Sequence, residues 1–132
     1  MPIRKLSHVT VIVPDQEEAL NWYTKVLGFE KRDDHTDPTY KYRWLTVAPE
    51  GQEELKIILH KAQNEREEAR IGRGIMWGFE TEDCRKTFQE LTERGVIFTS
   101  PPEDFRWGVS AVFRDLYGNP YGLMEPREEL FS

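Results

Sequence analysis

The sequence predicts an α+β fold built from two tandem βαβββ modules, and an internal repeat is the main observation behind this prediction. An alternating β-branched run at His8–Val13 precedes an apolar stripe at helical spacing, which ends at Gly28. A second extended run at Ile75–Glu80 precedes a second amphipathic stretch, which ends at Gly95. One helix covers only one face of such a half-sheet. We therefore expect a cupped mixed sheet with the helices on its outer face.

The first strand and helix have clear start and stop signals. Val9, Val11 and Val13 form one apolar face at a period of two residues, which suits packing under a helix. Pro14 ends the strand because it has no N–H to donate to a ladder. Asp15 then offers a side-chain oxygen as the helix N-cap.

The rest of the first half contains shorter extended segments. The polar stretch after Glu30 predicts the end of a second strand and a loop, and strands follow at Tyr40–Val47 and Leu55–His60. Between the last two, residues 48–52 (APEGQ) have turn composition. The highly charged run at residues 61–70 predicts a linker or a short helix.

The second half repeats this order. Thr81 is the predicted N-cap of a helix at Cys84–Arg94. Val96–Thr99 is predicted to be extended, and the Ser-Pro-Pro that follows is predicted to break it. Further strands are expected at Val109–Arg114 and Tyr121–Glu125.

Length and composition bound the class of protein. With 132 residues, we expect one domain with module one at about 1–62, a linker at about 63–72 and module two at about 73–132. The formal net charge of −6 argues against a nucleic-acid binder, which needs a basic face. The single cysteine, Cys84, excludes an internal disulfide and fits a cytoplasmic location. No apolar run approaches the roughly 20 residues of a membrane span.

Two stretches, HVTVIVPDQEEALNWYTKVLGFE and FRDLYGNPYGLMEP, resemble the vicinal oxygen chelate superfamily of glyoxalases, bleomycin resistance proteins and extradiol dioxygenases. The resemblance covers nearly the whole chain, and its most specific parts are NWYTKVLGFE and the D-x-x-G-N turn at Asp115–Asn119. It implies paired βαβββ modules. It also implies a homodimer, which the need to cover exposed sheet edges favours.

In most enzymes of this superfamily a divalent metal is held by His, Glu or Gln from the first, fourth, fifth and eighth strands. Of the corresponding positions in this chain only His8 can bind such an ion, because the others are Ile58, Met76 and Gly122. Catalytic metal sites keep about three protein ligands. We therefore expect no metal cofactor.

One alternative metal site stays open. His60 lies two residues beyond Ile58, on the same face of its strand. Glu80 lies four residues beyond Met76, roughly 13 Å along the strand. A divalent ion held by His8 with His60 and Glu80 would need a shift in strand register.

The predicted ligand-binding pocket in the cup is mostly apolar, and small residues such as Gly78 leave room in it. Trp107, beside Gly108, either forms a lid over an aromatic or apolar ligand at its rim or fills an edge of the core. Arg43 either binds an anionic group there or forms a surface ion pair with a nearby Glu. No catalytic residue is assigned. The predicted pocket residues are His8, Thr10, Arg43, Ile58, Met76, Trp107, Gly122 and Met124.

Three functional hypotheses follow. The first is a metal-free member of the superfamily that binds an apolar or aromatic small molecule in the sheet cup. The second is a divalent-metal-dependent lyase, isomerase or dioxygenase with an atypical ligand set that includes His8. The third is an interaction domain whose cup is filled by side chains. The missing metal ligands favour the first over the second, and an open pocket would favour the first over the third.

Overall fold

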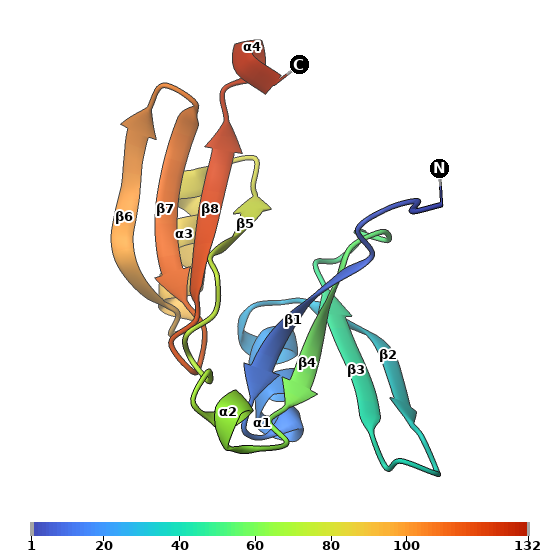
Figure 1. Ribbon diagram of the computed structural model, residues 1–132. Helices are drawn as coiled ribbons and strands as arrows, with labels where there is room; N and C mark the ends of the chain where they lie inside the picture. The colour runs from blue at the N-terminus through green and yellow to red at the C-terminus, as the bar shows by residue number, and fades with distance from the viewer. Residues whose placement is uncertain (1, 132) are drawn as a thin grey trace. The chain divides into compact units, whose positions relative to one another are not determined.

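The computed structural model describes residues 2–131, which divide into two compact units on either side of the Ile71–Gly72 bond. Each unit contains one four-stranded mixed sheet with helices (Figure 1). The predicted fold class, α+β with two tandem βαβββ modules, is confirmed. The elements of the first unit are β1 (His8–Val13), α1 (Gln16–Asn21), the π-helical η1 (Trp22–Val26), β2 (Glu30–Thr36), β3 (Arg43–Ala48), β4 (Lys56–Lys61) and α2 (Glu65–Glu68). Those of the second unit are β5 (Trp77–Glu80), α3 (Cys84–Glu93), β6 (Ile97–Phe105), β7 (Gly108–Arg114), β8 (Pro120–Pro126) and α4 (Glu128–Phe131).

The sheet of the first unit has the strand order β1-β4-β3-β2. β1 and β4 are parallel, and the other two pairs are antiparallel. The predicted apolar face of β1 is buried: Val13 is fully inaccessible to solvent, and Val9 and Val11 are nearly so. α1 lies against this sheet, and Ala19 of α1 and Tyr23 of η1 are completely buried (Figure 1). The core of this unit is therefore the layer between one face of the sheet and the helix.

The helix of the first unit begins where the sequence predicts and contains an unpredicted π-helical segment. Asp15 is the N-cap, and its Oδ1 accepts a hydrogen bond from the backbone N–H of Glu18 at 3.0 Å. In η1 the hydrogen-bonding pattern widens, so that Leu27 N–H donates to the carbonyl of Trp22, five residues back, at 3.1 Å. Gly28 follows with φ 84° and ends the helix, as predicted.

The sheet of the second unit has the order β5-β8-β7-β6, with β5 and β8 parallel. α3 packs on β6, β7 and β8 and covers one face of the sheet (Figure 1). On that face the ring of Tyr121 lies 5.1 Å from Phe79 and 5.5 Å from Phe113, between ring centroids. The opposite face carries the other side chains of each strand, because successive residues alternate.

The D-x-x-G-N turn that joins β7 to β8 buries its first and last residues, and their side chains are hydrogen-bonded. Asp115 and Asn119 are only 6% and 3% exposed, respectively. Asn119 donates to Asp115 twice, from its backbone N–H and from Nδ2, at 2.8 Å each. Its Oδ1 accepts the backbone N–H of Gly74 at 2.8 Å. The motif therefore ties the segment before β5 to the start of β8.

Four details of the sequence prediction are wrong. β3 begins at Arg43 and not at Tyr40. β6 does not stop at Thr99 but continues through Ser-Pro-Pro to Phe105. It can do so because it is an edge strand with register shifts, where proline is tolerated. Asp83, not Thr81, is the N-cap of α3, since its Oδ1 accepts the N–H of Lys86 at 3.1 Å. β5 begins only at Trp77.

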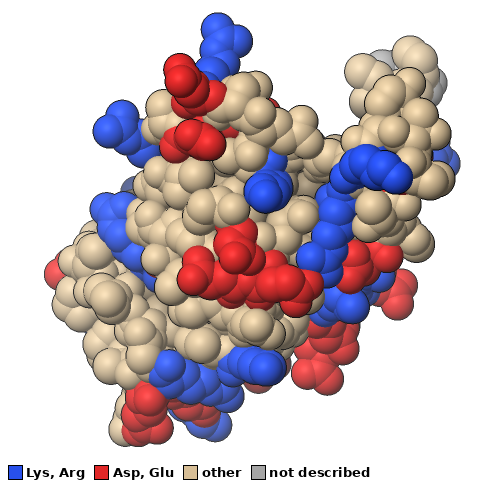
Figure 2. Space-filling view, turned by 90° about the horizontal axis from the view of Figure 1, so that it is seen from below, with Lys and Arg blue, Asp and Glu red and all other residues tan. Residues whose placement is uncertain are grey.

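The charged surface is mixed in sign. On the face shown in Figure 2, Lys and Arg side chains are interspersed with Asp and Glu and do not form one continuous basic surface. Such a surface lacks the concentrated positive charge that phosphate-backbone binding needs. Among residues 2–131, no helix is long and apolar enough to cross a bilayer.

Candidate ligand-binding site

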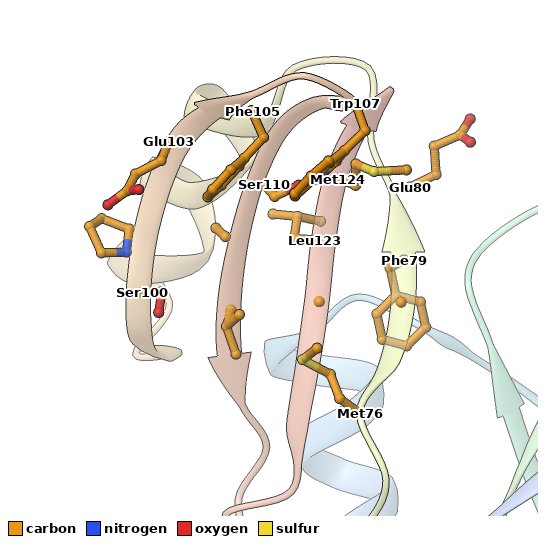
Figure 3. A pocket seen from close by; sticks show the side chains of 15 residues that line it. Met76, Phe79, Glu80, Ser100, Glu103, Phe105, Trp107, Ser110, Leu123 and Met124 are labelled. Atoms are coloured by element: carbon orange, nitrogen blue, oxygen red, sulfur yellow. The ribbon is translucent and has the colours of Figure 1, made fainter. Parts of the chain in front are cut away.

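The face of the second sheet opposite α3 contains a hollow of about 600 Å³ (Figure 3). All four strands of the sheet contribute to it, together with Met76, just before β5, and the turn between β6 and β7. Figure 3 shows Phe105 and Trp107 beside each other at one end of the hollow and Met76 at the other. The lining residues are Met76, Gly78, Phe79, Glu80, Ser100, Pro101, Glu103, Phe105, Trp107, Ser110, Ala111, Val112, Gly122, Leu123 and Met124.

Two glycines in neighbouring strands form the floor of the hollow. Gly78 of β5 and Gly122 of β8 are direct partners in the sheet register. A Cβ atom added at Gly78 would meet no atom within 4 Å, and one added at Gly122 would lie 3.8 Å from the Gly78 Cα atom. The space therefore exists because side chains are missing from these two positions.

An aromatic pair stands over one end of this floor. The rings of Phe105 and Trp107 are parallel, with an angle of 2° between their planes and 4.8 Å between their centroids. The indole Nε1 of Trp107 donates to Ser110 Oγ on β7 at 3.0 Å. Both aromatic residues remain partly exposed, 37% for Phe105 and 46% for Trp107. The ring surfaces that the stack leaves uncovered are therefore available to a ligand.

The polar groups of the hollow are few and lie mainly at its margins. The register connects Glu80 to Met124, Met124 to Ser110 and Ser110 to Glu103, so these four residues form one row across the sheet. The two carboxylates stand at opposite edges of that row (Figure 3). The lining contains no histidine, lysine, arginine or cysteine. Such a site can bind an apolar body.

The structure places four of the predicted pocket residues together in this hollow: Met76, Trp107, Gly122 and Met124 all line it. Gly78, which was predicted to leave space in the pocket, has open space on its Cβ side.

The other four predicted pocket residues belong to the first unit. His8 and Thr10 are exposed on β1, and Ile58 is buried on β4 directly beside Thr10. The His8 ring has Nδ1 2.8 Å from Ser7 Oγ and meets the ring of Trp44 edge to face, with 5.5 Å between centroids. These side chains line no part of the hollow on the second sheet.

Arg43 forms the ion pairs that were one of its two predicted roles. Its Nε and Nη2 donate to the carboxylate of Asp34 at 2.8 and 2.9 Å, and its Nη1 lies 2.7 Å from Glu17 Oε1. These hydrogen bonds to the Arg43 guanidinium lower the pKa of Asp34 to about 2. With two carboxylates already bound, Arg43 has little capacity left for an anionic ligand.

The predicted metal ligands His8 and His60 are not placed to bind one divalent ion. In the register of β1 and β4, His8 lies opposite Lys56, and His60 lies opposite Ile12. His8 and His60 are therefore four residues apart along the strand direction, or roughly 13 Å. Both ring nitrogens of His60 are also engaged, Nδ1 by Tyr42 Oη at 2.8 Å and Nε2 by Glu67 Oε1 at 2.9 Å.

Within the described part of the chain, no group of three or more His, Cys, Asp or Glu side chains is placed to hold a metal ion. Glu80 stands at the edge of the hollow in the second unit. Glu125, near the end of β8, uses its Oε1 to accept the N–H of Cys84 at the start of α3, at 3.0 Å.

Several lining residues escaped sequence reasoning. Ser100, Pro101 and Glu103 lie in the part of β6 that was predicted to be broken. Phe105 was missed as well; it is the last residue of β6, pairs with Gly108, and directly precedes the turn that contains Trp107.

The paired βαβββ modules and the hollow on an open sheet face define the structural class of this protein. It belongs to the Glyoxalase/Bleomycin resistance protein/Dioxygenase superfamily, whose family model matches residues 5–122. The resemblance found in the sequence is thereby confirmed.

Three relatives illustrate the likeness. UcmS2, whose crystal structure is known, is 35% identical in sequence to this chain, and the two structures superpose with a TM-score of 0.83. The match covers 93% of this chain and 98% of UcmS2. TnmS3, an antibiotic binding protein from Streptomyces sp. CB03234, is 30% identical, with a TM-score of 0.77, and the match covers 96% of this chain and 99% of TnmS3. YurT from Bacillus subtilis (strain 168) is 35% identical over 123 residues, which are 87% of this chain and 94% of YurT.

Proposed function

We propose that this protein binds an apolar or aromatic small molecule in the hollow of its second sheet, without a metal cofactor. The observation that carries the proposal is the floor of Gly78 and Gly122 beneath the stacked pair of Phe105 and Trp107. A volume of about 600 Å³ lies within the range of sites for small organic ligands. The parallel rings offer a flat surface for stacking against an aromatic ligand.

The relatives support a particular kind of ligand. TnmS3, which matches nearly the whole chain, is an antibiotic binding protein. An antibiotic-sized compound with a planar apolar part suits both this likeness and the aromatic pair. The metal-dependent lyase, isomerase or dioxygenase has no support from the ligand geometry, because the side chains of His8 and His60 are far apart.

We also propose that the protein acts as a cytoplasmic homodimer. Each sheet has two edge strands, β1 and β2 in the first unit and β5 and β6 in the second. Unpaired edge strands favour association with a second chain. A single buried thiol at Cys84 suits a reducing compartment.

The binding proposal is tested by filling the floor. In Gly78→Leu the new side chain enters open space, and Gly78 is not among the residues with positive φ. We expect wild-type protein to bind Nile red, a neutral planar dye, with increased fluorescence that is unchanged by EDTA. In the variant, affinity should fall at least about tenfold, because the leucine occupies the volume of the dye.

The matched control is Thr99→Leu, which adds the same side chain to an exposed position of the same sheet outside the hollow. Its dye affinity should equal that of the wild type. Failure of the wild type to bind Nile red, or equal binding by the Gly78→Leu variant, would refute the proposed site.

A further inference from the structure

The turn that carries the aromatic pair is held by one residue from outside the hollow, Arg127. Its backbone N–H donates to the carbonyl of Trp107 at 2.8 Å. Its side chain donates from Nε to the carbonyl of Arg106 at 2.7 Å and from Nη2 to that of Phe105 at 3.0 Å. Three consecutive carbonyls of the turn therefore accept hydrogen bonds from a single residue.

The local backbone explains why this turn needs an outside donor. Gly108 pairs with Pro126 at the end of the β7–β8 ladder, and proline has no N–H to give. Gly108 has φ 142°, and a Cβ atom there would clash with the carbonyl oxygen of Glu125. The turn therefore packs closely against the end of β8. Pro126 has no N–H to donate to it, and the next residue, Arg127, supplies the donors instead.

The hydrogen bonds of Arg127 act on the residues that form one wall of the hollow. Two of the three carbonyls belong to Phe105 and Trp107, whose rings stack with 4.8 Å between centroids. The planar guanidinium presents its donors to the two neighbouring carbonyls in a fixed geometry, whereas the three donors of an ammonium group rotate on a flexible stem. Holding these peptide groups restricts the direction in which both rings leave the backbone.

We infer that Arg127 is a positioning residue for the ligand-binding site, which fixes the Phe105–Trp107 pair without touching the ligand. This inference rests on the proposed function of the hollow. A preorganised wall loses less conformational freedom when a ligand binds. Without Arg127 the turn would sample other conformations, and a bound ligand would dissociate faster.

The test uses Arg127→Ala and Arg127→Lys in protein labelled with 5-fluorotryptophan, which gives one ¹⁹F signal for each of the four tryptophans. The signal of Trp107 is assigned with Trp107→Phe. In Arg127→Ala we expect only this signal to shift and broaden, and Nile red affinity to fall roughly fivefold, as for the loss of partly exposed charged hydrogen bonds. Arg127→Lys should recover part of the affinity, since an ammonium group can still donate to carbonyls of the turn but lacks the fixed geometry of the guanidinium.

Arg114→Ala is the matched control, because Arg114 also donates to a backbone carbonyl, that of Gly118 at 2.6 Å, at the opposite end of β7. It should leave the Trp107 signal and the dye affinity unchanged. A Trp107 signal and dye affinity in Arg127→Ala equal to those of the wild type would overturn the inference. So would equal changes in all four signals, which would indicate a general loss of structure.

The two proposals can fail separately. If wild-type protein does not bind Nile red, the proposed function is refuted, while the ¹⁹F signal still decides whether Arg127 fixes the ring pair. If the wild type binds the dye and Arg127→Ala does so equally well with an unchanged signal, only the positioning role is lost.

Discussion

Asn119 shows how a polar residue that looks like a surface turn residue in the sequence becomes part of the core. It is almost completely buried, and its amide connects Asp115 to the backbone of Gly74. Without the amide, the N–H of Gly74 would lose this acceptor and Asp115 Oδ2 would lose this donor, while Asp115 Oδ1 would still accept the N–H groups of Tyr117 and Asn119. Unpaired buried polar groups are costly, so the residue contributes to stability even though it lies in a loop.

We therefore predict that Asn119→Ala lowers the free energy of unfolding by about 2–4 kcal/mol, measured by urea denaturation followed by circular dichroism. The control is Asn21→Ala, at an exposed position near the end of α1, which should change stability by less than about 0.5 kcal/mol. Equal effects of the two substitutions would show that the buried amide has no special role.

Residue patterns in the sequence were sufficient for local features and insufficient for long-range contacts. Asp15 was predicted as an N-cap because its type and position suffice to define that role. Met76, Trp107, Gly122 and Met124 were predicted to face a common pocket from strand periodicity and family resemblance, and they line one hollow. The contacts of Arg127 with the turn at residues 105–107 could not be predicted, because no spacing rule connects residues so far apart in the chain.

At the scale of elements, β6 was the least predictable strand. Ser100, Pro101 and Pro102 have a composition typical of a break, yet β6 passes through them. Prolines fit there because β6 is an edge strand and its register shifts twice against β7. Sequence alone does not reveal which strand will lie at the edge of a sheet. The part of the hollow formed by β6 was missed for this reason.

The pairing of β2 with β3 is reinforced by the ion pair between Asp34 and Arg43. The pKa of Asp34 is lowered from 3.8 to about 2, chiefly by hydrogen bonds from the guanidinium. A carboxyl group whose pKa is lower in the folded than in the unfolded chain stabilises the fold at pH values above its unfolded pKa. This stabilisation is lost as the pH falls from about 4 towards 2.

We predict that the free energy of unfolding falls more steeply between pH 5 and pH 2.5 in the wild type than in Asp34→Asn, which lacks the titrating group. Because the pair is partly exposed and screened, the difference should stay below about 1 kcal/mol. Urea titrations at several pH values measure it. Asp104→Asn, which removes a largely exposed ion pair with Arg85, serves as the control. Identical pH profiles for wild type and Asp34→Asn would disprove the assignment.

At the scale of the whole molecule, the repeat in the sequence predicted two βαβββ modules, and the chain has them. Each module buries one face of its sheet under a helix, and each sheet has two edge strands whose outer sides pair with no other strand of that sheet. Edge strands are normally covered, charged or paired in soluble proteins. β2 carries many charged residues, whereas β1 is mostly apolar.

We predict from these edges that the protein is a homodimer at micromolar concentration. Size-exclusion chromatography with light scattering should give twice the chain mass of 15.6 kDa. Val11→Lys is unsuitable as a test because Val11 is buried, whereas Thr10→Lys changes an exposed position of the edge strand β1. The dimer should weaken in Thr10→Lys if β1 contributes to the interface. A wild-type mass equal to one chain would exclude the dimer.

The glycine floor has a consequence for how selectivity can change in this architecture. Positions 78 and 122 lie side by side, and the backbone at both tolerates a side chain. A single substitution at either position would make the cavity shallower in steps of one or two methyl groups, leaving the aromatic wall untouched. In proteins with this sheet, substitutions at these two positions alone therefore change selectivity by the thickness of the ligand that fits, without any change in the loops.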